Sequence, residues 1–376
     1  MIEDQPSSTH PPLPPTTEEQ RFQWLRLLRS RRVGVSTFHR LMAEHRTAAA
    51  ALDALPEVAR SAGVKDYRIC PEAVVVKELS LAKRAKAEML TIGDPSYPTQ
   101  LSAIKDAPPV LWSVGRRKHL NKPCVALVGA RNASSLGTRM AALLAKELGD
   151  AGWVTVSGLA RGVDASVHRA SIETGTIAVQ AGGVDIAYPV ENAHLFEDVG
   201  RKGLRLSEDP IGLNPSARYF PKRNRIISGL TQATIVIEAA VKSGSLITAR
   251  TALDQGRDVM AVPGHPFDPR AGGCNLLIRD GATLVRTIDD VLEALETAKP
   301  VTPHSPKAPK QRKLDLRTTH ALHQEILARL SPTPVPEDDI AEALRADSGT
   351  FAAALTELEL DGSVTRHSGG LLSKAG

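Results

Sequence analysis

The sequence has few cysteines, few aromatic side chains and no long apolar run. Its three cysteines among 376 residues lie far apart, with no CxxC pair and no Cys/His cluster at zinc spacing. This disfavours a disulfide framework and a structural metal site. No run of about 18 apolar residues occurs, so we expect no insertion into a membrane. The first residues resemble no secretion signal, and we therefore expect a cytoplasmic protein.

Several catalytic signatures are also missing. The patterns GxxxxGK[ST], HExxH and GxSxG do not occur. Nothing therefore supports P-loop nucleotide hydrolysis, a zinc protease or an α/β-hydrolase nucleophile. No pair of carboxylates stands out as a hydrolytic dyad. We expect no catalytic residue, no metal and no cofactor.

The overall composition is that of a folded chain with a mildly basic balance. Apolar residues make up 42% and charged residues 24% of the sequence. At about 150 residues per domain, the length predicts two or three domains. Lys plus Arg minus Asp plus Glu is 47 − 42 = +5, which indicates a nucleic-acid partner only if the charge is clustered.

The N-terminal part is predicted to be a short lead followed by helices. Residues 1–17 are rich in proline and lack apolar periodicity, so we expect them to be disordered. A small helical domain is expected at 18–90, with a helix start at Thr17 and, in the piece 32–52, a second helix behind a turn at Gly34. It resembles SAM or helix-hairpin-helix modules, but ordinary packing is favoured over DNA binding there.

Strands and helices then alternate over residues 91–295. The short apolar runs that we assign to strands are PCVALVGA, WVTVSG, TIAVQAGG, LRLSE, ATIVIEAA and DVMAVPG. Such alternation with Val/Ile-rich strands is typical of a parallel sheet covered on both faces. We therefore predict a doubly wound α/β fold, an extended Rossmann-like sheet.

The C-terminal part is predicted to be a linker and a small domain. Residues 296–316 are rich in proline and cations, which is typical of a solvated linker. Residues 317–376 show three short helices and a Gly-turned hairpin, the order of a winged helix. Because 344–361 holds Arg345 as its only cation, protein contact or packing is favoured over base reading there.

Candidate site residues lie in loops that follow the expected strands. In open parallel sheets, ligands bind beyond the carboxyl ends of the strands. In VGARNASSLG, Gly129 permits a close turn and Arg131 supplies a cation, which suits a phosphate. The loop is not GxGxxG, because Arg131 stands where the second glycine would let a pyrophosphate approach. NAD is therefore disfavoured, and an ordinary turn with a surface arginine stays open.

The next loop, SGLARGVDASVH, repeats the pattern with Gly158 and Gly162. Asp164 and His168 follow at i and i+4 on one face of the next helix. Such a pair can perform acid–base chemistry, but a helix-start carboxylate with a structural imidazole is more common. We favour the structural role.

The stretch YFPKRNRIISGL carries the strongest indication of a ligand. Lys222, Arg223 and Arg225 lie close to Phe220 and the tyrosine before it, in a chain with only six Phe, three Trp and four Tyr. Cations contact backbone phosphates and rings stack on bases, so this pattern favours a nucleic acid over a solvated helix face. Farther on, SGSLIT places hydroxyls at a helix start, where an anion can bind.

These blocks together resemble one family. In order and spacing they are similar to the bacterial DNA-processing protein A family, also called DprA or Smf. The stretches that carry the resemblance are YPTQLSAIKDAPPVLWSVG, VALVGARNASSLG, VSGLARGVDASVH, LSEDPIG, FPKRNRIISGL, SGSLITA and VPG…N…LIRDGA. They cover about residues 95–285, and the flanks resemble that family's helical N-terminal and winged-helix C-terminal domains.

The resemblance implies a non-enzymatic protein that binds single-stranded DNA. Members of the family shield the strand from nucleases and help to load the RecA recombinase in natural transformation, and they typically act as homodimers. The DNA-binding residues carried over by motif are Gly129, Arg131, Gly158, Gly162, Phe220, Lys222, Arg223, Arg225, Ser243, Gly244 and Thr248. Ala130 and Cys274 depart from the family pattern.

Two other functions stay open. Related Rossmann proteins that cleave nucleoside monophosphates carry a helix-borne glutamate after a glycine-rich loop. In this chain, Arg250 follows SGSLITA and no acid comes before Asp254, so a hydrolase would have to use Asp164 or Glu208. The third possibility is an assembly scaffold whose basic rim contacts an acidic protein.

Overall fold

The computed structural model describes two compact parts of the chain. It covers residues 14–297, 316–331, 333–344, 361–367 and 371–374, with a few positions between 351 and 359. The chain divides into the units Met1–Lys299 and Pro300–Gly376. Residues 1–13 of the lead expected at 1–17 lie outside the described residues. The same holds for residues 298–315 of the linker expected at 296–316.

Four helices form the N-terminal part of the first unit. They are α1 (Glu18–Arg29), α2 (Val35–His45), α3 (Ala48–Ser61) and α4 (Glu72–Arg84). As expected, α1 begins at Thr17, whose hydroxyl accepts a hydrogen bond from the N–H of Gln20 in a capping box. The single helix expected behind Gly34 in the piece 32–52 is wrong. The chain leaves helical geometry at Arg46, with φ 64°, and Thr47 caps a new helix.

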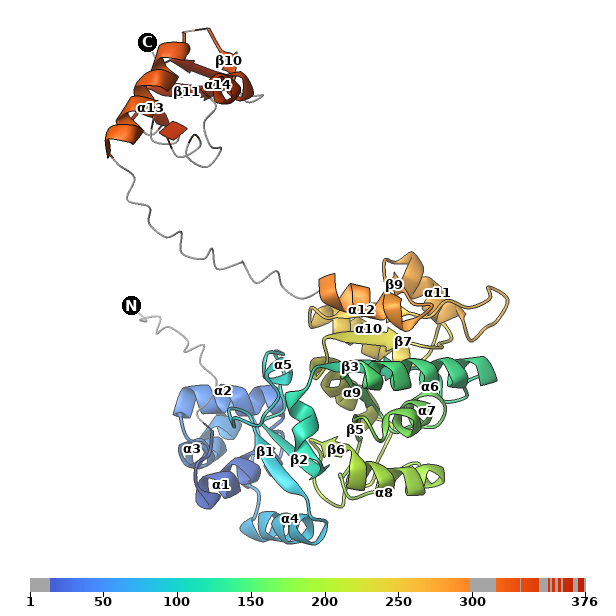
Figure 1. Ribbon diagram of the computed structural model, residues 1–376. Coiled ribbons are helices and arrows are strands. Elements are labelled where there is room, and N and C mark those ends of the chain that lie inside the picture. The colour runs from blue at the N-terminus through green and yellow to red at the C-terminus, as the bar shows by residue number, and fades with distance from the viewer. Residues whose placement is uncertain are drawn as a thin grey trace. The chain divides into compact units, whose positions relative to one another are not determined.

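A nine-stranded sheet is the centre of the described first unit, in the order β1-β2-β6-β5-β4-β3-β7-β8-β9 (Figure 1). The strands are β1 (Glu88–Thr91), β2 (Val110–Gly115), β3 (Cys124–Val128), β4 (Val154–Ser157), β5 (Thr176–Val179), β6 (Leu204–Ser207), β7 (Ala233–Val236), β8 (Asp258–Ala261) and β9 (Thr283–Leu284). All pairs from β6 to β9 are parallel, which confirms the doubly wound α/β fold. The sequence patterns did not predict β1 and β2. Strand β2 pairs antiparallel with β6, and β1 pairs antiparallel with β2.

Helices cover both faces of this sheet because successive residues of its strands face opposite layers. In β3, Val125 and Leu127 belong to one apolar core, whereas Ala126 and Val128 belong to the other. The helices between and after the strands are α5 (Thr99–Ser102), α6 (Ser135–Asp150), α7 (Val163–Ser171), α8 (Ala193–Lys202), α9 (Tyr219–Gly229), α10 (Ser245–Asp254), α11 (Gly272–Arg279) and α12 (Ile288–Thr297). Short 3-10 turns lie at Arg117–Asn121 and Val190–Asn192.

The chain reverses its direction across the sheet after β6. It runs from β3 through β4 and β5 to β6, and then places β7 on the other side of β3. The helix after β3, α6, packs in one core layer, and the helix after β7, α10, packs in the other. The loops after β3 and β7 therefore diverge, and a crevice opens between them at the carboxyl ends of the strands.

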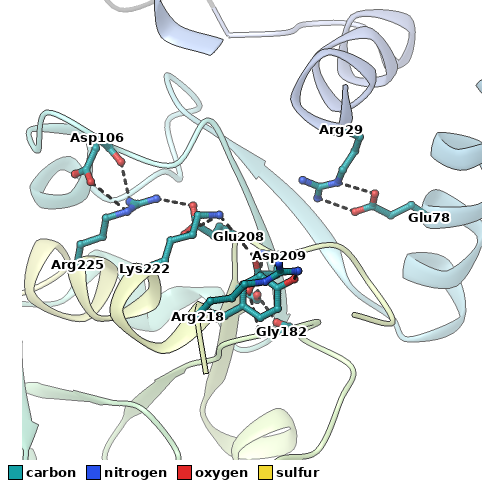
Figure 2. A network of polar contacts seen from close by, with 11 residues as sticks. Arg29, Glu78, Asp106, Gly182, Glu208, Asp209, Arg218, Lys222 and Arg225 are labelled. Carbon is teal, nitrogen blue, oxygen red and sulfur yellow. Dashed lines mark hydrogen bonds and ion pairs between the residues drawn. The ribbon is translucent and has the colours of Figure 1, made fainter. Parts of the chain in front are cut away.

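A buried ion pair ties the helical part to the sheet. The carboxylate of Glu78 on α4 accepts two hydrogen bonds from Arg29 on α1, at 2.9 and 2.8 Å (Figure 2). The same carboxylate accepts a bond of 2.9 Å from the indole N–H of Trp112 on β2. Glu78 is 5% exposed. These contacts fix the helices against the antiparallel edge of the sheet.

The second unit has its own core. Its elements are α13 (Leu316–Arg329), β10 (Val335–Pro336), α14 (Glu337–Leu344), β11 (Val364–His367) and β12 (Leu371–Lys374). The strands form a sheet in the order β10-β12-β11, with β11 and β12 antiparallel. Ile326, Ile340 and Leu372 are buried together. Helices followed by a hairpin agree with the expected winged-helix-like domain.

Replacing Glu78 should destabilise the first unit strongly. In Glu78→Ala, the guanidinium of Arg29 stays buried without its carboxylate, and the free energy of unfolding should fall by about 3–5 kcal/mol. Urea denaturation followed by tryptophan fluorescence measures this change. Glu72→Ala removes the exposed partner of Arg26 and should cost at most about 1 kcal/mol. Equal losses in the two variants would contradict the structural role of Glu78.

Candidate functional site

An open cleft of about 920 Å³ lies at the crevice between the loops after β3 and β7. Its walls come from the loop after β3, the first turns of α9, and the loop after β7 with the start of α10. Volumes of about 300–1,000 Å³ are usual for ligand sites. The cleft occupies the topological switch point of the sheet, where open α/β folds bind ligands.

Cations and rings meet at the mouth of the cleft. The guanidinium carbon of Arg131 lies 4.6 Å from the centre of the Phe220 ring, and that of Arg223 lies 5.9 Å from it. The ring of Tyr188 is 5.9 Å from that of Phe220, at an interplanar angle of 43°. Tyr188 is 45% exposed. The cluster presents ring faces and charge to a ligand at the same point.

Arg223 is the buried member of this cluster. Its Nη1 donates to the carbonyl of Gly158 after β4, at 2.7 Å, and to that of Val179 at the end of β5. Burial lowers the pKa of Arg223 to about 10, although Asp164 opposes this effect, so the group is charged at neutral pH. A Cβ at Gly158 would lie 2.4 Å from the guanidinium, so a larger residue there would displace Arg223. Arg223 therefore anchors α9, and with it Phe220, to two strand ends.

Glu238 holds the loop that carries Arg131. Its carboxylate accepts hydrogen bonds from the N–H of Ser134 at 3.0 Å and from the Ser134 hydroxyl at 2.5 Å. Its own carbonyl accepts from the N–H of Ala130 at 2.7 Å. A Cβ at Gly137 would come within 2.5 Å of the carboxylate. Because Glu238 follows β7, it joins the two loops of the crevice.

The expected glycines Gly129 and Gly162 permit close backbone packing beside this loop. A Cβ at Gly129, which lines the cleft, would lie 2.6 Å from Val163. Gly162 has a φ of 74°, and its Cβ would lie 2.3 Å from the carbonyl oxygen of Ala130. Glycine is required at Gly162 on both grounds. The two positions shape the loop through the backbone.

The start of α10 forms the opposite wall. Ser243, Gly244 and Thr248 all line the cleft, as expected. The hydroxyls of Ser243 and Ser245 are 2.7 Å apart. The N–H groups of Ser245, Leu246 and Ile247 donate locally, to the hydroxyl of Ser243 and to the carbonyls of Ser243 and Gly244. The hydroxyls and the positive end of the helix dipole are therefore what this wall offers to an anion. This wall therefore suits a phosphate group.

Lys222 and Arg225 are not part of the cleft lining. Instead, Lys222 lies 3.4 Å from Glu208, and Arg225 forms ion pairs with Glu208 at 2.5 Å and with Asp106 at 3.2 Å (Figure 2). The sequence predicted that Phe220, Lys222, Arg223 and Arg225 line one groove with Arg131. Only Phe220 and Arg223 line the cleft together with Arg131. Helical geometry is the reason. Positions 220, 223, 224 and 227 share the cleft-facing side of α9, while 222 and 225 lie off that stripe.

Asp164 and His168 do not form an acid–base pair. The Asp164 carboxylate accepts hydrogen bonds of 3.2 Å from the N–H groups of Gly158 and Ala160. His168 Nδ1 contacts the Thr176 hydroxyl at 2.8 Å inside the core. Burial lowers the pKa of His168 to about 3, so it is neutral near pH 7. Both side chains have the structural role that the sequence favoured.

The structure adds cleft residues that sequence reasoning missed. Lys242 and Arg270 line the cleft, and Arg161 lines an adjoining hollow of about 310 Å³ with Tyr188. Arg131, Lys242 and Arg270 form no ion pair with any residue that the structure describes. The scarcity of aromatics could have marked Tyr188, and Lys242 adjoins an expected serine. No sequence signal marks Arg270.

Within the described ranges, no group of three or more His, Cys, Asp or Glu side chains could hold a metal ion. The buried cysteines Cys70, Cys124 and Cys274 are free thiols. None of the helices in the described part of the chain is long and apolar enough to cross a bilayer.

Comparisons with known sequences identify relatives along most of the chain. The family model described as DNA recombination-mediator protein A matches residues 88–296. A DprA-like N-terminal HHH domain matches 18–80, and a DprA winged helix domain matches 306–370. DNA processing protein DprA of Bacillus subtilis is 44% identical over 209 residues, 55% of this chain and 70% of the relative. Protein Smf of Escherichia coli is 36% identical over 277 residues, 73% of this chain and 74% of the relative.

Two solved structures share the fold. DNA processing protein A of Streptococcus pneumoniae aligns with a TM-score of 0.58 and 35% identity, over 72% of this chain and 92% of that chain. DNA processing protein A of Helicobacter pylori, studied for its single-stranded DNA binding mode, aligns with a TM-score of 0.52 and 28% identity. That match covers 57% of this chain and 98% of the other. The expected family resemblance is confirmed.

The Arg225–Glu208 pair should make stability depend on pH. Burial raises the pKa of Glu208, and Arg225 and Lys222 oppose this effect. In Arg225→Met, the buried carboxylate of Glu208 loses its 2.5 Å partner and keeps only Lys222 at 3.4 Å, which should cost about 3–5 kcal/mol at pH 7. Since folded Glu208 then binds a proton more tightly than the unfolded chain, this loss should shrink as the pH falls toward 4.5, the ordinary value.

Urea denaturation at several pH values measures this effect. Arg201→Met, which removes the exposed partner of Asp198, serves as the matched control and should show a small effect at every pH. A loss in Arg225→Met that does not change with pH would contradict the prediction.

Proposed function

The chain belongs to the DNA recombination-mediator protein A family, and from this premise we propose that it binds single-stranded DNA in the cleft between the loops after β3 and β7. The observation that carries the proposal is the Phe220 ring beside the Arg131 and Arg223 guanidinium groups, at the mouth of an open cleft. The relative from Helicobacter pylori, studied for its single-stranded DNA binding mode, supports it.

The cleft offers each chemical group that a flexible strand requires. Arg131, Lys242 and Arg270 neutralise phosphates, and the hydroxyls of Ser243 and Ser245 at the start of α10 add donors for a phosphate oxygen. Phe220 and Tyr188 stack on bases. Stacking needs an unpaired base with an open face, so the site prefers a single strand to a duplex. Contacts to backbone and ring faces imply little sequence preference.

The wider role follows the family. The bound strand is shielded from nucleases in the cytoplasm, and the protein acts as a homodimer that helps to load RecA recombinase onto incoming DNA in natural transformation. Family membership is the support for these parts of the proposal.

A binding role without catalysis fits the carboxylates around the cleft. Asp164 accepts hydrogen bonds from two backbone amides and lies near Arg223, and Glu208 is paired with Arg225 and Lys222. Asp164 lines the cleft, but both carboxylates are engaged by these contacts within the fold. A nucleotide hydrolase is therefore the weaker proposal. Release of free base from nucleoside monophosphates, without retention of DNA, would reverse this order.

Removing Arg131 or Phe220 should weaken strand binding in different ways. Phe220→Ala should lower the affinity for a fluorescent oligothymidylate by about 5- to 150-fold, the equivalent of about 1–3 kcal/mol for one base stack. Arg131→Ala should lower the affinity and reduce the slope of log K against log salt by about 0.7, one phosphate contact. Anisotropy titrations at several salt concentrations separate the two effects.

The matched control is Arg169→Ala, an exposed arginine on α7 away from the cleft lining. Its affinity and salt slope should equal those of the wild type. Wild-type affinity in both Arg131→Ala and Phe220→Ala would contradict DNA binding in this cleft and would favour a scaffold for an acidic protein.

Glu238 should support binding even though it is negatively charged. If only long-range electrostatics mattered, Glu238→Ala would raise the affinity for a polyanion. Because Glu238 positions the Arg131 loop through Ser134 and Ala130, we expect the affinity to fall instead, toward that of Arg131→Ala. Glu238→Gln keeps an acceptor for Ser134 and should retain more of the affinity. Tighter binding by Glu238→Ala would overturn the positioning role.

A further inference from the structure

The loop between β8 and α11 presents an aromatic pair to solvent. Phe267 is 91% exposed. The imidazole of His265 lies beside it, with ring centres 5.5 Å apart and an interplanar angle of 37°. Burying a phenylalanine side chain typically contributes about 1.5–3 kcal/mol. Folding gains no such stabilisation from the exposed Phe267, in a chain with only six phenylalanines.

Local hydrogen bonds hold this loop in one shape. The Asn275 side chain accepts from the N–H of Gly264 at 3.1 Å and donates to its carbonyl at 2.9 Å. The N–H of Asp268 donates to the carbonyl of His265 at 2.9 Å. The N–H of Phe267 also donates to Nδ1 of His265, at 3.3 Å. Phe267 therefore lies in a turn whose backbone conformation is fixed by hydrogen bonds.

The same loop reaches the cleft. Arg270 lines the cleft, and Phe267 precedes it by three residues, a separation of at most about 11 Å along the chain. The Asp268 carboxylate accepts from the N–H of Arg270 at 2.9 Å, which links the two halves of the loop. A strand that contacts Arg270 therefore passes within a few nucleotides of the Phe267 ring.

We infer that His265 and Phe267 form a second base-stacking site, which takes unpaired bases of the strand after it leaves the cleft at Arg270. The inference rests on the proposed function and extends it. A base is favoured over a protein partner because Arg270 of the same loop and Lys242, which also lines the cleft, are cations that pair with no residue in the described part of the chain. A single ring beside open cations suits a polyanion with flat bases.

Strand length provides the test. The full chain is titrated with oligothymidylates from about 4 to about 16 nucleotides, the usual range of strand site sizes. For the longest strands, Phe267→Ala should lose about 5- to 150-fold in affinity, the equivalent of one base stack. For the shortest strands, which occupy the cleft alone, it should bind like the wild type. Phe220→Ala should lose affinity at every length.

Two further variants complete the design. Phe267→Trp should keep the affinity, and its indole fluorescence should be quenched by long strands and not by the shortest ones, once the wild-type signal of the buried Trp24 and Trp112 and the partly buried Trp153 is subtracted. Leu253→Ala, an exposed apolar residue on α10, is the matched control and should bind every strand like the wild type.

The outcomes separate the two proposals. Unchanged binding of long strands by Phe267→Ala, or an equal loss at all lengths, would overturn the second stacking site and leave DNA binding in the cleft intact. Unchanged strand affinity with an altered oligomeric state in sedimentation would show a protein contact at Phe267 and would also overturn it. If the wild type bound no strand of any length, the proposed function itself would fail.

Discussion

The candidate site depends on one buried cation, Arg223. Its guanidinium donates to the carbonyl groups of Gly158 and Val179, at the ends of β4 and β5. These carbonyls would otherwise end parallel strands without partners, and an unpaired buried polar group is costly. The same contact fixes the first turns of α9, so Phe220 stands where Arg131 can lie against it. If α9 were shifted by one helical turn, the Phe220 ring would no longer lie in the cleft.

A second constraint disfavours a dinucleotide at this Rossmann-like sheet and fits the strand that we propose. In dinucleotide-binding folds, a pyrophosphate lies at the N-terminus of the helix after the first strand of the parallel sheet. Here the corresponding helix is α6, and the Glu238 carboxylate bonds to Ser134 at its start. The protein thus supplies its own anion there. Positive charge is presented instead by Arg131, which reaches the open side of the loop.

The basic block on α9 has two separate roles because a helix turns its residues to different sides. Arg223 anchors the strand ends. Lys222 and Arg225 pair with Glu208 and oppose the rise in its pKa that burial causes. The cations left open to a polyanion come from loops, Arg131, Lys242 and Arg270 among them. Open loop cations next to a ring are the arrangement that the proposed strand binding requires.

The sequence by itself determined the parallel sheet, its flanking domains and the loops that carry the site. These follow from local properties, because apolar runs of strand length and glycines at strand ends can be recognised one segment at a time. It also marked Arg131, Phe220 and the start of α10. Only the tertiary structure decided which cations remain open. Whether Arg225 meets Glu208, or Arg270 meets the cleft, depends on segments distant in the chain, and so does the role of Glu238 at α6. Pairings of this kind have no periodicity along the sequence, because the fold alone brings their partners together.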